Sequence, residues 1–280
     1  RTTLSVQARN FGLSISVADI VAVNGKPAKG VLTERRTQLN RSTAPTPGQA
    51  IADAARGELM DRYFEILETD GTPIGTIMTS GLSGGVAPPG APSAQTVADF
   101  TVTGGTGAFL GVRGQGGGTR DPRPAPRAAS MSEDPANRRI HGGGSRRLIL
   151  QLIPLSRPEV VVAPEGPAVV HATDFTLVTT ARPARPGEIL SLIATNLGPT
   201  RPGVDPGQPF PATPRQIVNS PMEVTVNGAS AEVLYAGGYP GTTNAYQVNF
   251  QLPSGIRPGS ATLQLTVAWI AGPEVRIAVQ

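Results

Sequence analysis

Apolar and polar residues alternate one by one along many short segments of this chain. The clearest are LSISVADIVAV at 13–23 and AYQVNFQL at 245–252. A period of two puts every second side chain on the same face of a β-strand, so each such segment has one apolar face to place on a core. Glycine and proline, which make turns and break helices, number 34 and 28 among the 280 residues. The chain is therefore predicted to be all-β, with many turns.

A single segment favours a helix. QAIADAARGELM at 49–60 is rich in alanine, but Gly57 interrupts it at a cost of about 1 kcal/mol relative to alanine. The sequence around it predicts strands again, at 61–82, 98–115 and 145–155. NGKP at 24–27 and Asp70-Gly71 predict turns between strands, because asparagine, aspartate and glycine accept the positive φ angles of tight hairpins.

The second half of the chain has a more regular strand pattern. Asn227-Gly228 marks a hairpin there, and RPGS at 257–260 marks a further turn. Seven short strands at this spacing are typical of an Ig-like β-sandwich. They are expected at 174–180, 188–197, 222–227, 231–236, 245–252, 261–270 and 274–280. The proline-containing segment 156–167 is predicted to be a linker between domains 1–155 and 168–280.

The glycine-rich stretch FTVTGGTGAFLGVRGQGGG at 100–118 allows several interpretations, of which a nucleotide loop is the first. Dinucleotide binding needs G-x-G-x-x-G followed by a helix, whereas here the third glycine comes one residue late and a strand pattern follows. A sharp corner between two strands explains the same residues, because glycine permits both the bend and a positive φ. Phe109 is expected to anchor this corner, and its turn glycines are Gly104, Gly105, Gly107 and Gly111.

The stretch VADFTVTGGTGAFLGVRGQ resembles the glycine signature of the allene oxide cyclase and dirigent β-barrel superfamily. The preceding RGELMDRYFEILETDGTPIGTIMTSGL is similar to an earlier hairpin of that family, and the apolar strand 147–154 fits as well. The resemblance implies an antiparallel eight-stranded β-barrel over residues 1–155. It also implies a frequently trimeric assembly and a central cavity in which a small reactive molecule is cyclised or coupled.

Four residues are candidates for chemistry in such a cavity. Tyr63 and Glu65 share one strand face, opposite Phe64 and Ile66, because side chains alternate along a barrel strand. Asp99 and Arg113 flank the glycine corner. An acidic side chain beside a guanidinium could serve as general acid and anion clamp. The alternative is a structural pair or a row that faces solvent.

A second resemblance covers about 110 residues of the other half. RPGEILSLIATNLGP at 185–199, MEVTVNGASAEVLYA at 222–236 and AYQVNFQLPSGIRPGSATLQLTV at 245–267 are similar to a C-terminal module of secreted acidobacterial proteins. This resemblance implies an Ig-like fold and export, and it implies no particular activity.

Positive charge gathers in one segment of the chain. The net charge is +4, and eight arginines lie between positions 113 and 147 against three acidic residues. No aromatic residue is available there to stack on a base, so nucleic-acid binding is not expected. The first interpretation of the segment is a basic loop in solvent. The second is an assembly loop that packs on its own barrel or contacts neighbouring copies, with an anionic glycan as a further candidate partner. Its arginines are Arg120, Arg123, Arg127, Arg138 and Arg139.

Composition excludes several kinds of site. The chain has no cysteine, and its two histidines, His141 and His171, are thirty residues apart, so we expect no metal and no cofactor. No apolar run is long enough for a membrane-spanning helix. The chain starts at Arg1 rather than Met, which would follow from removal of a signal peptide or from trimming.

These features predict an exported, self-associating structural protein of the cell surface or extracellular space, such as a fibre subunit. The alternating segment TLSVQARNFGLSISVADIVAV would add a strand to the sheet of a neighbouring copy. The alternative is a secreted dirigent-like or cyclase-like protein that acts on a small hydrophobic molecule in the barrel cavity. A third hypothesis is carbohydrate binding by the second domain, through Trp269, Tyr235, Tyr239 and Tyr246.

Overall fold

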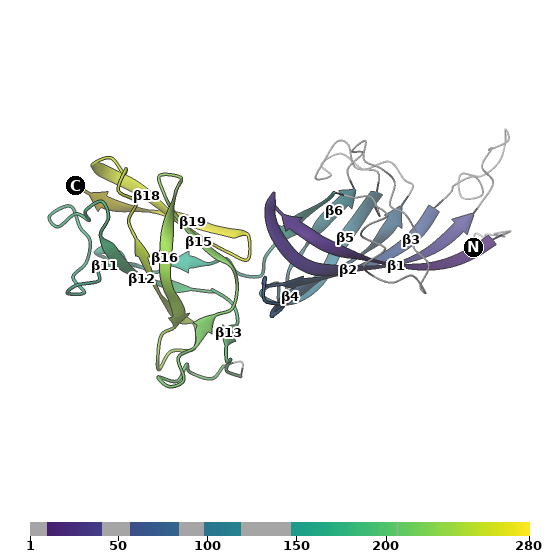
Figure 1. Cartoon of the computed structure of the whole chain (residues 1–280), viewed down its shortest axis with the longest axis horizontal. Coiled ribbons are helices and arrows are strands. Elements are labelled where there is room, and N and C mark those ends of the chain that lie inside the picture. Colours follow the sequence, from purple (N-terminus) through teal and green to yellow (C-terminus); the bar gives the residue numbers. More distant parts are fainter. Residues whose placement is uncertain (1–9, 41–56, 84–97, 119–146, 206) are drawn as a thin grey trace, which may run out of the picture. The chain divides into compact units, whose positions relative to one another are not determined.

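The structure is a computed structural model that describes residues 10–40, 57–83, 98–118, 147–205 and 207–280. These residues form strands and turns and contain no helix. The chain divides into two units (Figure 1). The first comprises 1–67, 75–106 and 110–153, and the second comprises 68–74, 107–109 and 154–280. The all-β fold predicted from the alternating pattern is confirmed.

One antiparallel sheet of seven strands, arranged in sequence order, makes up the first unit. It curls into a nearly closed, barrel-like form (Figure 1). Its strands are β1 (Asn10–Val23), β2 (Lys26–Asn40), β3 (Gly57–Leu67), β4 (Pro73–Ser83), β5 (Ala98–Gly107), β6 (Arg113–Gly118) and β7 (Leu148–Ile153). The sequence predicted eight strands for this sheet, and the described residues provide seven.

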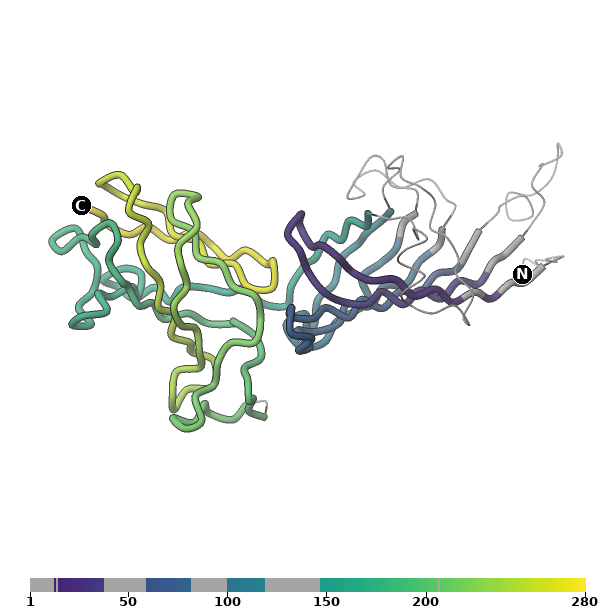
Figure 2. Tube along the Cα trace, in the orientation of Figure 1, coloured from purple at the N-terminus to yellow at the C-terminus, as the bar shows by residue number. Residues whose placement is uncertain are grey.

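Two hairpin turns of this sheet form where the sequence predicted them. Asn24 and Gly25 reverse the chain between β1 and β2 with φ angles of 50° and 78°. Figure 2 follows this long hairpin along the chain. Between β3 and β4, Gly71 has a φ of 93°, and the carboxylate of Asp70 accepts a hydrogen bond from the Thr72 amide at 2.8 Å. Glycine, asparagine and aspartate are used at these sites because they tolerate or stabilise the tight reversal.

The helix expected at 49–60 is wrong for its last four residues, because Gly57–Met60 form the start of β3. Leu59 pairs with Thr37 of β2, and Met60 is buried in the core of the sheet. Strand pairing and burial of every second side chain therefore override the helix preference of this segment. Residues 49–56 lie outside the described part of the chain.

The core of the first unit lies on one face of the sheet. A glycine of β6 keeps this face closely packed: a Cβ at Gly116 would lie 2.5 Å from the Phe100 ring. A side chain at position 116 would therefore push β6 away from its neighbours. The buried apolar side chains of the described residues are Met60, Phe64, Ile66, Ile77, Phe100, Val102 and Val112.

The glycine corner lies later in the chain than the sequence predicted. Gly104 and Gly105 lie within β5, whereas the turn spans residues 108–111. Gly107 and Gly111 flank it with positive φ angles of 60° and 74°. Phe109, at the tip, is only 2% exposed. The stretch is thus a strand, a tight turn and a strand, and no helix follows it that could hold a phosphate.

A continuous antiparallel sheet with the form of a half-barrel makes up most of the second unit. Its main path runs β11-β12-β17-β16-β15-β18-β19, and β16 pairs with β15 at its start and with β17 along the rest. The main strands are β11 (Val169–His171), β12 (Ile189–Thr195), β15 (Met222–Val226), β16 (Ala229–Gly238), β17 (Ala245–Gln251), β18 (Gly259–Val267) and β19 (Ile270–Val279). Short strands of the same sheet are β8 (Glu159–Val160), β13 (Thr200–Arg201) and β14 (Ile217–Val218). The strands β9 (Val162–Ala163) and β10 (Gly166–Pro167) pair with each other in a separate two-stranded sheet.

The core of this unit collects the inward side chains of both halves of the sheet. Every second residue of β17 and of β18 is buried, as the period-two pattern predicted. The hairpin at Asn227-Gly228 is confirmed, with φ angles of 50° and 77°. The largest fully buried side chains here are Phe250, Leu190, Leu192, Leu197, Leu252, Leu263 and Leu265.

Three local expectations for the second unit differ from the structure. Residues 174–180 form a turn and an isolated bridge at Leu177, while the strand is β11 just before them. The turn predicted at 257–260 lies at 254–255, and Gly259 already begins β18. The predicted linker 156–167 packs within this unit, because β8 pairs with β12 and Val160 is buried.

Candidate functional site

The site residues predicted on β3 lie on its exposed face. Tyr63 is 48% exposed and Glu65 is exposed, whereas Arg62, Phe64 and Ile66 are buried. The alternation along β3 was therefore predicted correctly, but the buried face is the other one. Period two alone cannot tell which face is which when both carry charged and aromatic residues.

Arg113 makes contacts with the main chain. Its Nη1 donates to the carbonyl oxygens of Thr103 at 2.6 Å and of Val112 at 3.1 Å, across the corner between β5 and β6. Asp99 lies in β5, but its side chain is outside the described part of the structure. A catalytic role for Tyr63, Glu65, Asp99 and Arg113 stays a prediction. The arginines 120, 123, 127, 138 and 139 of the predicted assembly loop also lie outside the described residues.

A charged pair is buried in the core of the first unit instead. Glu34 comes from β2, and Arg62 lies directly opposite it on β3. The Nε of Arg62 is 2.5 Å from Oε2 of Glu34, and both side chains are 3% exposed. Arg36, two residues along β2, binds the other carboxylate oxygen through its Nε at 2.5 Å.

The Arg62 guanidinium also contacts an aromatic ring and a sulfur atom. Its Cζ lies 4.5 Å from the centroid of the Phe100 ring, and its Nη2 lies 2.9 Å from the sulfur of Met60. Burial raises the pKa of the Glu34 carboxyl, but Arg62 and Arg36 outweigh it, so the pKa lies below its usual value. Glu34 is thus held ionised against a cation in the barrel core.

The sequence carries a signal for this pair, although the pair belongs to no motif. Glu34 and Arg62 stand at positions whose neighbours two residues away, Leu32 and Phe64, are apolar. A charge in the inward register of an alternating strand must have a partner, because an unpaired buried charge is too costly. Two such residues of opposite sign on adjacent strands predict an internal ion pair.

The exposed face of the same sheet carries apolar side chains from two strands. Leu13, Ile15 and Val17 of β1 are 68%, 66% and 64% exposed, and Leu59 and Tyr63 of β3 are exposed in the same rows of the sheet. We call these five residues the outer patch. The sequence predicted that the apolar face of residues 13–23 would cover a core. That prediction is wrong, because this face lies on the surface.

A polar pair lies inside the outer patch. Arg35 of β2 binds the carboxylate of Asp61 through its Nε at 3.1 Å, and the Ser80 hydroxyl donates to the same carboxylate at 2.8 Å. These bonds, from Ser80 first and then from Arg35, lower the pKa of Asp61 below its usual value. The outer patch therefore combines apolar side chains with a fixed positive and negative charge, as surfaces that bind other proteins commonly do.

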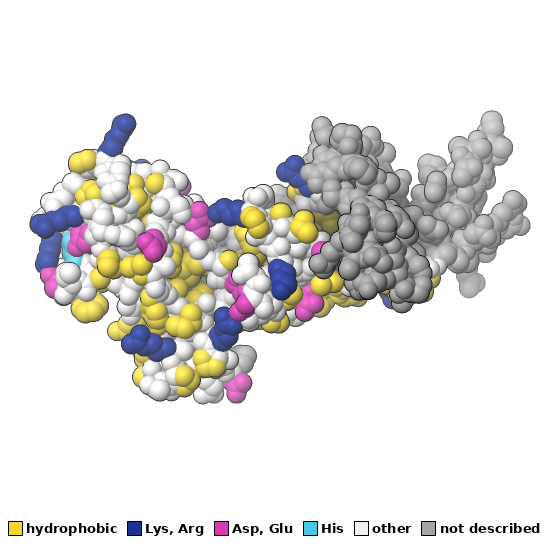
Figure 3. All heavy atoms as spheres, in the orientation of Figure 1, with side chains coloured by type: hydrophobic (Ala, Val, Ile, Leu, Met, Phe, Trp, Pro, Cys, Tyr) yellow, Lys and Arg dark blue, Asp and Glu magenta, His cyan; other side chains and the backbone are white. Residues whose placement is uncertain are grey.

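β1 is also an edge strand of the sheet. It pairs with β2 on one side, and the path of the described sheet begins with it. Ser16 and Ala18, which point to the opposite face from the outer patch, are exposed too. Apolar side chains at the described surface are coloured yellow in Figure 3. A long edge strand that exposes apolar residues is a template for pairing with another strand.

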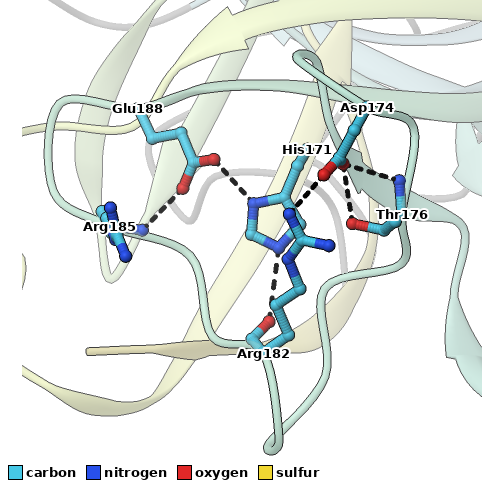
Figure 4. Close-up of polar contacts among 6 residues, drawn as sticks. All are labelled: His171, Asp174, Thr176, Arg182, Arg185 and Glu188. Carbon is cyan, nitrogen blue, oxygen red and sulfur yellow. Dashed lines mark hydrogen bonds and ion pairs between the residues drawn. The ribbon is translucent and has the colours of Figure 1, made fainter.

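A second polar cluster closes a loop of the second unit (Figure 4). His171 ends β11, and its Nδ1 lies 2.6 Å from the Glu188 carboxylate, which precedes β12. Its Nε2 lies 3.3 Å from the main-chain oxygen of Arg182. The Arg182 side chain binds Asp174, which also accepts a hydrogen bond from the Thr176 hydroxyl at 2.7 Å.

The arrangement around His171 is structural rather than catalytic. A histidine paired with a carboxylate is part of many hydrolase sites, but there the second ring nitrogen faces a hydroxyl. In this chain that nitrogen faces a carbonyl oxygen, and His171 is 3% exposed. We call His171, Asp174, Thr176, Arg182 and Glu188 the His171 cluster. Their contacts fasten residues 174–188 onto the sheet.

The aromatic residues proposed to bind carbohydrate do not share one surface role. Tyr246 is 5% exposed, and its ring packs at a tilt against Phe210 with the ring centroids 5.1 Å apart. Its hydroxyl donates to the Gly198 carbonyl at 2.7 Å. Burial raises the pKa of Tyr246. Tyr239 is exposed, and Trp269 has a positive φ of 63° at the turn between β18 and β19. Tyr246 is thus a core residue.

The described residues provide neither a metal site nor a membrane-spanning helix. Among the residues that the structure describes, no three histidine, cysteine or acidic side chains are grouped closely enough to hold a metal ion. No helix in the same part of the chain is long and apolar enough to cross a membrane.

Comparisons with known proteins assign no family. The chain matches no protein-family model, and comparison with curated proteins and with solved structures gives no match either.

Proposed function

We propose that this chain is a subunit of an exported, self-associating structural protein of the cell surface or extracellular space. In this proposal the first unit is a dirigent-like, eight-stranded barrel in its assembled form, and the second is an Ig-like sandwich. Copies associate through the first unit, where a strand from the N-terminal segment of one copy joins the sheet of the next, as in a fibre. β-strand addition of this kind supplies main-chain hydrogen bonds and side-chain pockets together.

The exposed edge strand β1 is the observation that carries this proposal. Leu13, Ile15 and Val17 are about two-thirds exposed on a strand whose outer edge has no partner in the described sheet. A strand added beside β1 brings its own side chains against this row and buries part of its apolar area, at roughly 25 cal/mol per Å². Soluble proteins often blunt such edges with charges, yet between Asn10 and Ile20 the only charged residue is Asp19. The register shift of β1 lies beyond this row, between Ile20 and Ala22.

Deletion of residues 1–9 tests the proposal. The full chain should form oligomers or fibres in light scattering and electron microscopy, and the shortened chain should be monomeric. A matched control exchanges Thr3 for Ser and Ser5 for Thr, which keeps the length and polarity of the segment and should leave association intact. Full chain and shortened chain that are both monodisperse monomers would contradict self-association.

A second function is supported by the buried pair of Glu34 and Arg62. Together with the Phe100 ring, these groups place polar and aromatic chemistry inside the barrel-like sheet, as binding of a small hydrophobic molecule with one polar end would require. Thr79, also in this core, has a buried hydroxyl with no hydrogen-bond partner in the described structure. In this alternative the chain is a dirigent-like or cyclase-like protein that acts on a small hydrophobic molecule.

Probe binding distinguishes this second function. The chain without residues 1–9 is titrated with 1-anilinonaphthalene-8-sulfonate, whose fluorescence rises in an apolar site. A small-molecule site predicts saturable binding that Thr79→Val alters, while Thr76→Val, at an exposed hydroxyl pair on the same strand, leaves it unchanged. Absence of saturable binding would argue against a cavity function.

A further inference from the structure

The two edge strands of the first unit run in the same direction. The sheet is antiparallel and its seven strands follow one another in sequence order, so direction alternates from β1 to β7. With an odd number of strands, the first and the last are parallel. β1 pairs with β2, and β7 pairs with β6, while each has its other edge facing away from the described sheet.

Direct closure of β1 onto β7 would therefore introduce a parallel pair into an antiparallel sheet. Parallel ladders have slanted hydrogen bonds and are slightly less stable per residue. A single additional strand, antiparallel to both, satisfies the main-chain groups of both edges at once and gives an even number of strands. Closure of this kind removes the exposed edges that a nearly closed barrel retains.

We propose that the seam between β1 and β7 takes residues 3–8 of a second copy, in a direction antiparallel to both strands. The inference rests on the self-association proposed above, and it specifies where the donated strand binds and in which direction it runs. Each copy donates one strand and accepts one strand at a different surface. Because donor and acceptor sites differ, the contact is head-to-tail, and repetition gives an open fibre or a ring.

Length and pattern of the donor segment match the seam. TLSVQA is six residues long, and β7 is also six residues long. Its apolar residues Leu4, Val6 and Ala8 alternate with polar ones, so they can form one row beside Leu13, Ile15 and Val17. Aliphatic cross-strand neighbours on one face of a sheet stabilise the pair by roughly 0.2–1 kcal/mol each.

The donor segment comes from a second copy because the chain cannot readily reverse into its own seam. Asn10 and Phe11 are already paired with Asn40 and Leu39 of β2. A reversal would have to occur within residues 7–9, Gln-Ala-Arg, which contain no glycine, proline, asparagine or aspartate. Tight hairpins depend on those residues for their positive φ angles.

Disulfide trapping tests the seam, because the natural chain has no cysteine. The full chain with Val6→Cys and Gln151→Cys is oxidised and run on a non-reducing gel. Gln151 lies on the exposed face of β7, and Thr101 lies in the same row on β5, both of whose edges are paired. The matched control therefore combines Val6→Cys with Thr101→Cys. Leu4→Cys and Ala8→Cys cover the neighbouring registers.

The proposed seam predicts a ladder of covalent multimers when Val6→Cys is combined with Gln151→Cys. It predicts no ladder when Val6→Cys is combined with Thr101→Cys, and none when Ser5→Cys replaces Val6→Cys. The loss at position 5 follows because its side chain points to the other face. Equal ladders with Gln151→Cys and Thr101→Cys, or a cross-linked monomer alone, overturn it. Chains that associate in light scattering without any ladder overturn the seam but leave self-association standing, whereas a monomeric full chain contradicts both.

Discussion

Arg62 and Glu34 face each other from adjacent strands in the core of the first unit, with Nε 2.5 Å from Oε2. The Phe100 ring covers the guanidinium on one side. Two charges removed from water in this way stabilise a fold only while both are present. The pair therefore holds β2 and β3 in one register, because a slip by one residue would leave both charges without a partner.

Removal of one partner should be strongly destabilising. Glu34→Gln leaves the Arg62 charge buried without its full countercharge, and we expect a loss of about 3–5 kcal/mol in the free energy of unfolding of the first unit. Urea denaturation followed by circular dichroism measures it. As a control, Arg35→Ala removes the exposed partner of Asp61 and should cost less than about 1 kcal/mol. Equal losses for both variants would contradict a specific role for the buried pair.

Acidic pH should lower the free energy of unfolding of the second unit, because it weakens the contacts of the His171 cluster. Hydrogen bonds from Thr176, and then from Arg182, lower the pKa of Asp174 from 3.8 to about 2. For Glu188, burial acts upward, but the bonds from His171 and the Arg185 amide prevail, so its pKa is also lowered. A lowered folded-state pKa means that the unfolded chain binds protons first, so the contribution is complete above about pH 5 and is lost as the pH falls toward 2.

Denaturation of the second unit at pH 7, 4 and 2.5 checks this dependence. The variant that carries Asp174→Asn and Glu188→Gln should be less stable at pH 7 and should lose less stability on acidification. Asp205→Asn is a control at an exposed carboxyl. An unchanged slope of stability against pH in the double variant would show that other groups control the acid response.

Local turn chemistry was the most predictable part of the fold. Asn24-Gly25, Asp70-Gly71 and Asn227-Gly228 reverse the chain where the sequence placed hairpins, since few other residues accept those φ angles. The strand predicted at 174–180 is wrong for a related reason. Asp174 accepts hydrogen bonds from Thr176, and Phe175 has a φ of 56°, so a side-chain turn interrupts the apparent alternation.

The orientation of a strand was less predictable than its existence. Val17 and Tyr63 belong to real strands, but both point away from the core on which the buried face of the sheet packs. Alternation gives two faces and leaves their assignment to tertiary contacts. The Glu34–Arg62 pair shows the difficulty, because its charged residues occupy the inward positions that composition alone would give to apolar ones.

Gly238 should resist substitution because a ring lies directly over it. A Cβ at this position would overlap the Phe210 side chain, whose ring packs at a tilt against Tyr246. Gly238→Ala should therefore destabilise the second unit by about 1–3 kcal/mol, as overpacking of a core does. Gly255→Ala is the matched control, since a Cβ there meets nothing within 4 Å. Thermal unfolding of the two variants should differ clearly, and equal melting temperatures would contradict the packing.

Ile15 should matter for association and hardly for folding. Its side chain is 66% exposed in the outer patch, so Ile15→Thr changes little buried area in the single chain, and the free energy of unfolding should move by less than about 0.5 kcal/mol. Association should weaken, because Ile15 lies in the row against which the side chains of a donated strand would pack. Phe64→Ala, on the buried face of β3, should do the reverse and cost about 3–5 kcal/mol of stability. Light scattering and urea denaturation on both variants separate the two effects. If Ile15→Thr destabilised the monomer as much as Phe64→Ala, the outer patch would be part of the core rather than a surface for a second copy.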